Sequence, residues 1–105
     1  MKVIFDKEYL RDLYTKGKTT DKKHRFQPDI VRRYTKVIDI MIEAENVKVL
    51  ALFGGLHYEH LSGNKAGLSS VRVNEKYRIE FTEQTEENET VATICNIIEL
   101  SNHYE

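Results

Sequence analysis

Hydrophobic and polar residues alternate along residues 69–81, as they do in a half-buried β-strand. The apolar set is Val71, Val73, Tyr77, Ile79 and Phe81, and the polar set is Ser70, Arg72, Arg78 and Glu80. A three-residue loop at 74–76 keeps the two sets on separate faces and pairs Arg72 with Arg78, whereas a two-residue loop would mix them. The pattern therefore predicts a β-hairpin that sets two arginines opposite each other.

Like charges directly opposite each other destabilise a sheet. We therefore expect Arg72 and Arg78 to serve a ligand, with both side chains accessible to solvent on one face. The alternative is that Glu80, or another acid across the sheet, bridges the two arginines in a surface salt-bridge lattice.

The N-terminal half predicts one strand followed by two helices. Residues 2–5 form a short apolar run, and helical spacing then extends from Asp6, a candidate N-cap, to Gly17, a typical helix end. A stronger apolar stripe begins at Pro28 and ends near Asn46. The tyrosines expected in the core are Tyr9, Tyr14 and Tyr34.

The C-terminal half predicts strands. Residues 47–53 fit a short strand, a helical turn or a packed connector, and 62–67 form a turn. Residues 91–98 are nearly all apolar or small, which favours a last strand in the centre of the sheet.

This order of elements predicts an α+β fold in one domain, residues 1–105. An N-terminal strand and two helices pack on a mostly antiparallel sheet, and the helices cover one of its faces. The other face, with Arg72 and Arg78, is expected to remain available.

Composition narrows the class of protein. Hydrophobic residues make up 40% and charged residues 31% of the chain, as in globular proteins, and no apolar run reaches the length of a membrane span. Cys95 is the only cysteine, so an internal disulfide and a cysteine-based zinc site are excluded, and it is expected to be a small buried hydrophobe. We expect a cytoplasmic protein without a membrane partner.

Charge is distributed unevenly along the chain. Residues 1–36 carry eleven Lys and Arg against five Asp and Glu, whereas residues 79–105 carry seven Glu and no Lys or Arg. The basic half could bind along the phosphate backbone of a nucleic acid. Alternatively, its charges could simply keep the outer faces of the helices in contact with water.

Several polar side chains could support chemistry. Paired guanidinium groups match the oxygens of a phosphate and would stabilise charge that builds up on it during phosphodiester cleavage. Histidine transfers protons near neutral pH, although His57 and His60 could equally bond only water. No cluster of the usual ligands predicts a metal site or another cofactor.

The C-terminal half resembles the HigB branch of the RelE/ParE toxins of bacterial type II toxin–antitoxin systems. Residues 70–81 fit the pattern S-[IV]-R-[IV]-N-x-x-[YW]-R-I-x-F of that family. The remaining matching residues are Leu56, His57, Leu61 and Gly63 before the hairpin and His103 after the last strand.

This resemblance implies a small RelE-like, microbial-ribonuclease-type fold whose sheet forms the active surface. Such toxins enter the ribosome and cut mRNA without a metal or cofactor, by attack of a 2′-hydroxyl that leaves a cyclic phosphate. A helix-turn-helix antitoxin, HigA-like, binds and blocks the toxin, and operator DNA is reached only through that complex.

By the same resemblance, Arg78 stabilises the phosphate, Arg72 supplies a second positive charge, and His103 and His57 are candidates for proton transfer. The residues expected to contact RNA or the ribosome are Lys65, Ser70, Lys22, Lys23, Arg25 and Tyr104.

The chain departs from the family before the final histidine. Many HigB-like chains have an acidic residue and a tyrosine there, where this one has Ser101 and Asn102. If the acid is needed, either activity is weaker or Glu99 or Tyr104 substitutes for it. The alternatives are a ParE-type toxin that docks on DNA gyrase without catalysis, and a degenerate homologue that only binds its partner. Fold alone does not separate these cases.

Overall fold

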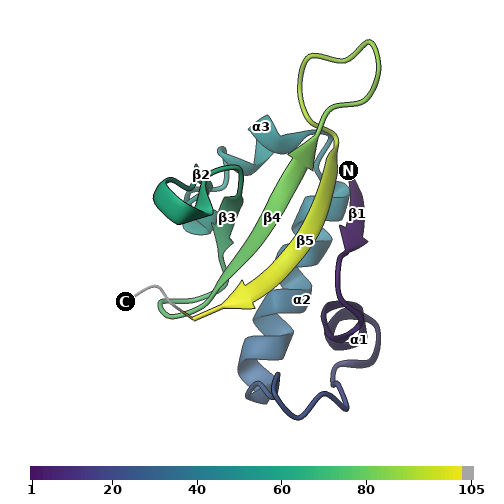
Figure 1. Cartoon of the computed structure of the whole chain (residues 1–105), viewed down its shortest axis with the longest axis vertical. Coiled ribbons are helices and arrows are strands. Elements are labelled where there is room, and N and C mark those ends of the chain that lie inside the picture. Colours follow the sequence, from purple (N-terminus) through teal and green to yellow (C-terminus); the bar gives the residue numbers. More distant parts are fainter. Residues whose placement is uncertain (103–105) are drawn as a thin grey trace.

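The computed structural model describes residues 1–102 and consists of a five-stranded sheet with helices on one face (Figure 1). The strands are β1 (Lys2–Phe5), β2 (Glu59–His60), β3 (Ser69–Arg72), β4 (Arg78–Gln84) and β5 (Ile94–Ser101). The helices are α1 (Glu8–Lys16), α2 (Pro28–Glu43) and α3 (Val47–Leu50), with short 3₁₀ turns at Gly54–Leu56 and Gly63–Lys65. The strand order is β1-β5-β4-β3-β2, and only the β1–β5 pair is parallel. The predicted α+β class and the mostly antiparallel sheet are confirmed.

Both predicted long helices form, but their ends differ from prediction. Gly17 ends α1 in the left-handed conformation, with φ of 73°, as expected. Asp6 is not the N-cap: its backbone N–H donates 2.9 Å to the carbonyl of Ile97, which extends the pairing of β1 with β5, and Lys7 precedes the helix instead. The helix therefore begins one residue later than predicted, and Lys7 makes no side-chain cap hydrogen bond.

The second helix ends earlier than predicted, at Glu43, because Ala44 leaves it in an extended conformation. Asn46 begins the next helix rather than ending this one, since its side chain accepts a 3.0 Å hydrogen bond from the backbone N–H of Lys48. Of the three possibilities left open for residues 47–53, the helical turn is the one that forms.

The last strand lies inside the sheet, between β1 and β4, although β4 rather than β5 occupies its centre, and it runs from Ile94 to Ser101 rather than from 91 to 98. Its register with β4 shifts by one residue between Glu80 and Phe81, so Glu80 pairs with Glu99 and Phe81 pairs with Ile97. This irregularity lets the strand continue until Ser101 lies opposite Arg78. The strand therefore reaches the arginine end of the sheet.

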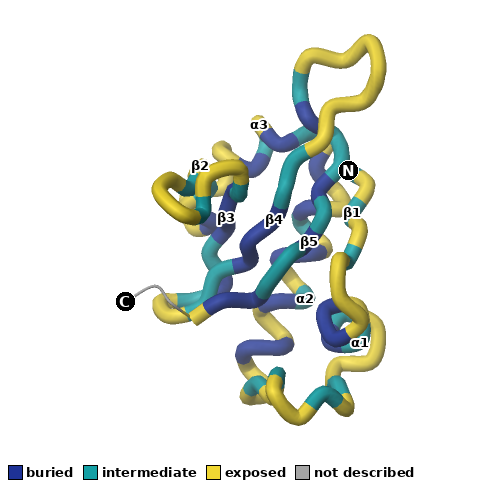
Figure 2. Tube along the Cα trace, in the orientation of Figure 1, coloured by how far each residue is buried: buried dark blue, intermediate teal, exposed yellow. Residues whose placement is uncertain are grey.

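The core lies between the helices and one face of the sheet (Figure 2). Leu10, Tyr34, Ile38 and Met41 of the helices, and Val71, Ile79, Phe81, Cys95 and Ile97 of the strands, are fully buried. Burial raises the pKa of the Cys95 thiol to about 12, in keeping with its predicted role as a small hydrophobe. Tyr9 and Tyr34 are core residues as predicted, whereas Tyr14 is only half-buried. Within residues 1–102, no helix is both long and apolar enough to cross a bilayer.

The hydroxyl of Tyr34 joins the two long helices, and its loss should weaken the fold. It is fully buried and donates 2.7 Å to the carbonyl of Leu10. In Tyr34→Phe we expect the free energy of unfolding to fall by about 1 kcal/mol, the usual net value of such a bond. Urea unfolding measures this.

Tyr14→Phe is the matched control, because the hydroxyl of Tyr14 bonds the exposed Asp39 at 2.5 Å. Its loss should cost less than about 0.5 kcal/mol, as for most surface changes. Equal losses in the two variants would contradict a special role for the buried bond.

Candidate functional site

Arg72 and Arg78 are cross-strand partners in the β3–β4 hairpin, as the alternation predicted. The loop has three residues, and Val73 donates its N–H 2.9 Å to the carbonyl of Tyr77. Asn74 shapes the loop, because its side-chain oxygen accepts from the backbone N–H groups of Lys76 and Tyr77 at 2.9 and 2.7 Å. Both arginines consequently lie on the sheet face opposite the core.

Arg78 is held in place by groups from two other segments. Its Nε donates 2.9 Å to Ser70 Oγ, and its Nη2 donates to the backbone carbonyl of His57. Only 11% of its side chain is exposed, so the expectation of two freely accessible arginines is wrong for Arg78. The segment that contains His57 folds over this end of the sheet. Ser70, expected to contact RNA, is itself fully buried and supports Arg78.

Arg72 is half-buried and reaches the ring of the same histidine. Its Nε donates 3.1 Å to the carbonyl of Asn74, and its Nη1 lies 3.2 Å from His57 Nε2. A guanidinium can only donate, so Nε2 must accept and the neutral ring must carry its proton on Nδ1. His57 has a φ of 45°, a strained value for a residue with a side chain, which is typical of functional segments.

Glu59 is the residue of this site that the sequence did not reveal. Its Oε1 lies 3.9 Å from Arg78 Nη2, and 55% of its side chain is exposed. A carboxylate beside a guanidinium can accept a proton from a substrate. The sequence carries no local signal for this contact, because Glu59 reaches the arginine face through the pairing of β2 with β3, where it lies opposite Ser70.

Lys65 pairs with Glu80 rather than standing free at the surface. Lys65 Nζ lies 2.5 Å from Glu80 Oε2, and the Glu80 side chain is only 2% exposed. An ion pair so strongly buried on one side is costly to break, so this contact fixes the 62–67 turn above the sheet. The Glu80 carboxylate, considered as a bridge for the arginines, is thus engaged by a lysine.

The basic loop between α1 and α2 is anchored by a residue that the sequence analysis did not select. The ring of His24 stacks on Tyr9 at 3.7 Å, and its Nδ1 lies 2.9 Å from Asp21 Oδ2. The hydrogen bond from His24, together with the N–H of Lys23, lowers the pKa of Asp21. Phe26 meets Tyr77 edge-on at 5.7 Å, which brings the loop beside the hairpin. Its predicted RNA-binding residues, Lys22, Lys23 and Arg25, are exposed there.

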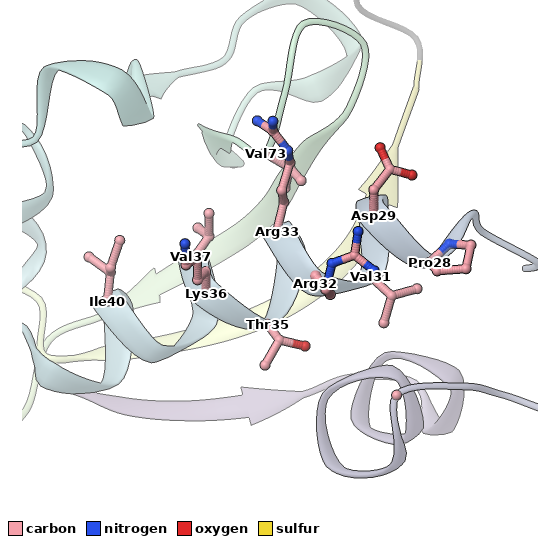
Figure 3. A pocket seen from close by; sticks show the side chains of 11 residues that line it. Pro28, Asp29, Val31, Arg32, Arg33, Thr35, Lys36, Val37, Ile40 and Val73 are labelled. Atoms are coloured by element: carbon pink, nitrogen blue, oxygen red, sulfur yellow. The ribbon is translucent and has the colours of Figure 1, made fainter.

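A further set of positive side chains lies on α2. Arg32, Arg33 and Lys36 line an open groove whose walls include Val37 and Val73 (Figure 3). A neighbouring groove shares Arg33 and Val73 with the first and also includes Arg72, Asn74 and Lys76. Positive side chains thus extend from Arg72 to the exposed side of α2, with the carboxylates of Asp29 and Glu75 among them.

The other candidates do not join this group. His60 is next to Glu59 on β2 but points to the opposite side, where its Nδ1 lies 3.1 Å from Ser69 Oγ. No three His, Cys, Asp or Glu residues come close enough to hold a metal ion in the described part of the chain, residues 1–102. His103 and Tyr104 lie outside the described residues.

Comparisons with known proteins agree on one group. Residues 3–96 match the family described as the RelE-like toxin of the type II toxin–antitoxin system HigB. Toxin HigB-1 of Vibrio cholerae serotype O1 is 32% identical over 82 residues, which cover 77% of this chain and 82% of that protein.

Solved structures show the same fold. The YoeB/ParE toxin from Agrobacterium tumefaciens superposes with a TM-score of 0.57 at 20% identity, covering 99% of this chain and 100% of that one. A chain of the YoeB-YefM complex from Staphylococcus aureus also superposes with a TM-score of 0.57, at 19% identity. The match covers 99% of this chain and 98% of that one. These likenesses confirm the RelE-like architecture expected from the sequence.

The contact between Arg72 and His57 predicts an uncommon tautomer. At pH 8, the ¹⁵N signals of His57 should show a protonated Nδ1 and an unprotonated Nε2, since the bond made by one nitrogen fixes the state of the other. Long-range ¹H–¹⁵N correlation spectra measure this. Arg72→Met should shift the ring toward the Nε2–H form, whereas the exposed Arg11→Met should not. An unchanged tautomer in Arg72→Met would refute the contact.

Proposed function

The chain belongs to the HigB toxins, the RelE-like toxins of type II toxin–antitoxin systems, and from this premise we propose that it is an endoribonuclease that cleaves mRNA on the ribosome and stops translation. HigB and RelE toxins are generally endoribonucleases. The observation that carries the proposal for this chain is the convergence of Arg72, Arg78, His57 and Glu59 on one face of the sheet.

The arginines suit the charge that develops in the reaction. A ribose 2′-oxygen attacks the adjacent phosphorus, the bond from phosphorus to the 5′-oxygen breaks, and a 2′,3′-cyclic phosphate and a 5′-hydroxyl result. Negative charge builds up on the non-bridging oxygens, and fixed guanidinium groups stabilise it without moving. The anchoring of Arg78 by Ser70 and His57 holds it in such a fixed position.

Glu59 is the proposed acceptor for the proton of the 2′-hydroxyl. The lone pair of His57 Nε2 is already engaged by Arg72 at 3.2 Å, whereas the Glu59 carboxylate is exposed beside Arg78. A second group must return a proton to the departing 5′-oxygen, and His103 is the candidate for this step by its place in the family pattern. Many HigB-like chains have an acidic residue shortly before this histidine, where this chain has Ser101. Ser101 is buried and lies opposite Arg78.

The proposed partners follow from the family. We expect a HigA-like helix-turn-helix antitoxin to bind and block the toxin, and operator DNA to be contacted only through that complex. The similar Staphylococcus aureus chain comes from a YoeB-YefM toxin-antitoxin complex. A ParE-type action on DNA gyrase and a degenerate, partner-binding homologue are the competing readings, and the experiment below distinguishes them.

Loss of Arg78 should strongly reduce RNA cleavage. We would induce the wild-type chain, Arg78→Ala, His103→Ala and the double variant in bacteria and map mRNA 5′ ends, with and without ribosome association. The wild-type chain should create new mRNA 5′ ends inside translated frames. Arg78→Ala should reduce the rate at which these ends form by roughly 10²–10³-fold, the usual effect of removing one oxyanion donor. The exposed Arg11→Ala is the control and should cut normally.

Each other outcome has a definite meaning. A further loss in His103→Ala assigns the chain end to proton transfer, while an unchanged rate leaves that step to Glu59 or His57. Growth arrest without new RNA ends would contradict the nuclease and lead to a gyrase assay. No arrest and no ends would support the degenerate homologue.

The exposed cations should contribute a salt-dependent attraction to the ribosome. Each lost phosphate contact should reduce the slope of log K against log[salt] by roughly 0.7–0.9. We predict such a reduction in Arg32→Gln/Arg33→Gln and in Lys22→Gln/Lys23→Gln, measured by ribosome binding at several salt concentrations. Lys48→Gln, on α3 and away from these grooves, is the control and should leave the slope unchanged. A slope that stays constant in both double variants would remove these residues from the interface.

A further inference from the structure

Residues 57–60 face two directions. His57 and Glu59 contact the arginines, while Tyr58 and His60 contact Glu83 and Ser69 on the other side of the sheet. The pairing of Glu59 with Ser70 and of His60 with Ser69 gives the same two faces, because Ser70 contacts Arg78 and Ser69 does not share that face. Whatever holds Tyr58 and His60 therefore also sets the position of His57 and Glu59.

One carboxylate holds this second side. Glu83 Oε2 accepts a hydrogen bond from the hydroxyl of Tyr58 and another, of 2.6 Å, from Ser69 Oγ. Since the hydroxyl proton of Ser69 goes to Glu83, Ser69 Oγ is left to accept from His60 Nδ1 at 3.1 Å. The ring of Tyr58 also stacks over the fully buried Phe81, with centroids 6.3 Å apart. Tyr58, Ser69 and His60 thus converge on Glu83, which lies on β4.

The network is largely shielded from water. Ser69 is 2% exposed and the Glu83 side chain 17% exposed, whereas His60 is the open end of the network. Burial and the hydrogen bond to Glu83 raise the pKa of Tyr58, so its hydroxyl remains a donor at physiological pH. Hydrogen bonds to a carboxylate in such surroundings are strong and directional.

Ser69, His60 and Glu83 do not form a hydrolytic triad. A nucleophilic serine must give its proton to the histidine and be open to a substrate. Here the serine donates to the carboxylate instead, and it is almost fully buried. The arrangement is suited to holding a segment rather than to attacking a bond.

The backbone alone holds this segment weakly. The β2 strand has only two residues and forms one edge of the sheet, and a pairing so short is not stable by itself. His57, two residues before the first residue of β2, adopts a left-handed conformation that its side chain disfavours. Side-chain anchoring is therefore needed to keep this segment in one arrangement.

We propose that Glu83 is a positioning residue of the active site: by binding Tyr58 and Ser69 behind the sheet edge, it holds His57 and Glu59 at the arginines in front of it. The assignment of His57 and Glu59 to catalysis rests on the proposed function. The anchoring of residues 57–60 by Glu83 concerns the structure alone, so it can be tested without measuring RNA cleavage.

The experiment compares Glu83→Gln and Tyr58→Phe with the wild-type chain. Tyr58→Phe keeps the ring on Phe81 and removes only the hydroxyl, so it remains informative where Glu83→Gln fails to fold. Glu87→Gln, in the exposed loop that follows β4, is the matched control for loss of one carboxylate. The first readout is the tautomer of His57 together with amide exchange of residues 58–61. The second is kcat and KM for cleavage of mRNA on programmed ribosomes.

We expect both variants to lose the Nδ1–H tautomer of His57 and the protection of residues 58–61, with Glu87→Gln unchanged. In cleavage, kcat should fall by roughly tenfold to a hundredfold with KM nearly constant, since displacement of a reacting group by about 1 Å has this effect. The double variant should be no worse than Glu83→Gln, because the two residues act through one hydrogen bond.

The outcomes separate the two proposals. Loss of the His57 signature in a chain whose wild type cleaves no RNA supports the anchoring and refutes the nuclease. Wild-type cleavage with unchanged His57 signals and unchanged kcat in Tyr58→Phe overturns the anchoring and leaves the nuclease intact. A fall in kcat with unchanged His57 signals and exchange also overturns it, because Glu83 would then act by another route.

Discussion

The register of the β3–β4 hairpin is the constraint from which the site follows. Asn74 closes a three-residue loop by accepting two backbone N–H groups, and this loop pairs Arg72 with Arg78. A slip of one residue would turn Val71 and Ile79, both fully buried, toward solvent. The hydrophobic core therefore fixes the face on which the arginines lie, although neither arginine belongs to the core.

Two facing guanidinium groups repel each other, and the surrounding segments offset that repulsion with acceptors. Arg78 donates to Ser70 and to the carbonyl of His57, and Arg72 donates to the carbonyl of Asn74 and to the His57 ring. These four acceptors are neutral, and the carboxylate of Glu59 lies 3.9 Å from Arg78 Nη2 with 55% of its side chain exposed. Guanidinium groups fixed by such hydrogen bonds are suited to binding a phosphate, because their donors are already oriented.

Much of the fold could be predicted from local pattern. The alternation at 69–81 predicted the hairpin, its loop length and its register. Helical spacing predicted two helices, the first ending at Gly17 and the second beginning at Pro28. The errors fell at helix ends, where a neighbouring element uses the residue that was expected to end or begin the helix. Asp6 binds β5 instead of capping a helix, and Asn46 caps the following helix instead of ending the one before.

The sequence by itself determined the elements, the faces of the hairpin and the chemistry of the arginine pair, because these depend on spacing of a few residues along the chain. Only the tertiary structure decided that His57 meets both arginines, that Glu59 joins them, and that Glu83 holds the segment from behind. These contacts join residues far apart in the chain through the folding of 54–61 over the sheet edge. The periodicity of the sequence does not reveal how this segment crosses the sheet edge. That position is set by the pairing of β2 with β3 and by the packing of side chains on the buried face of the sheet.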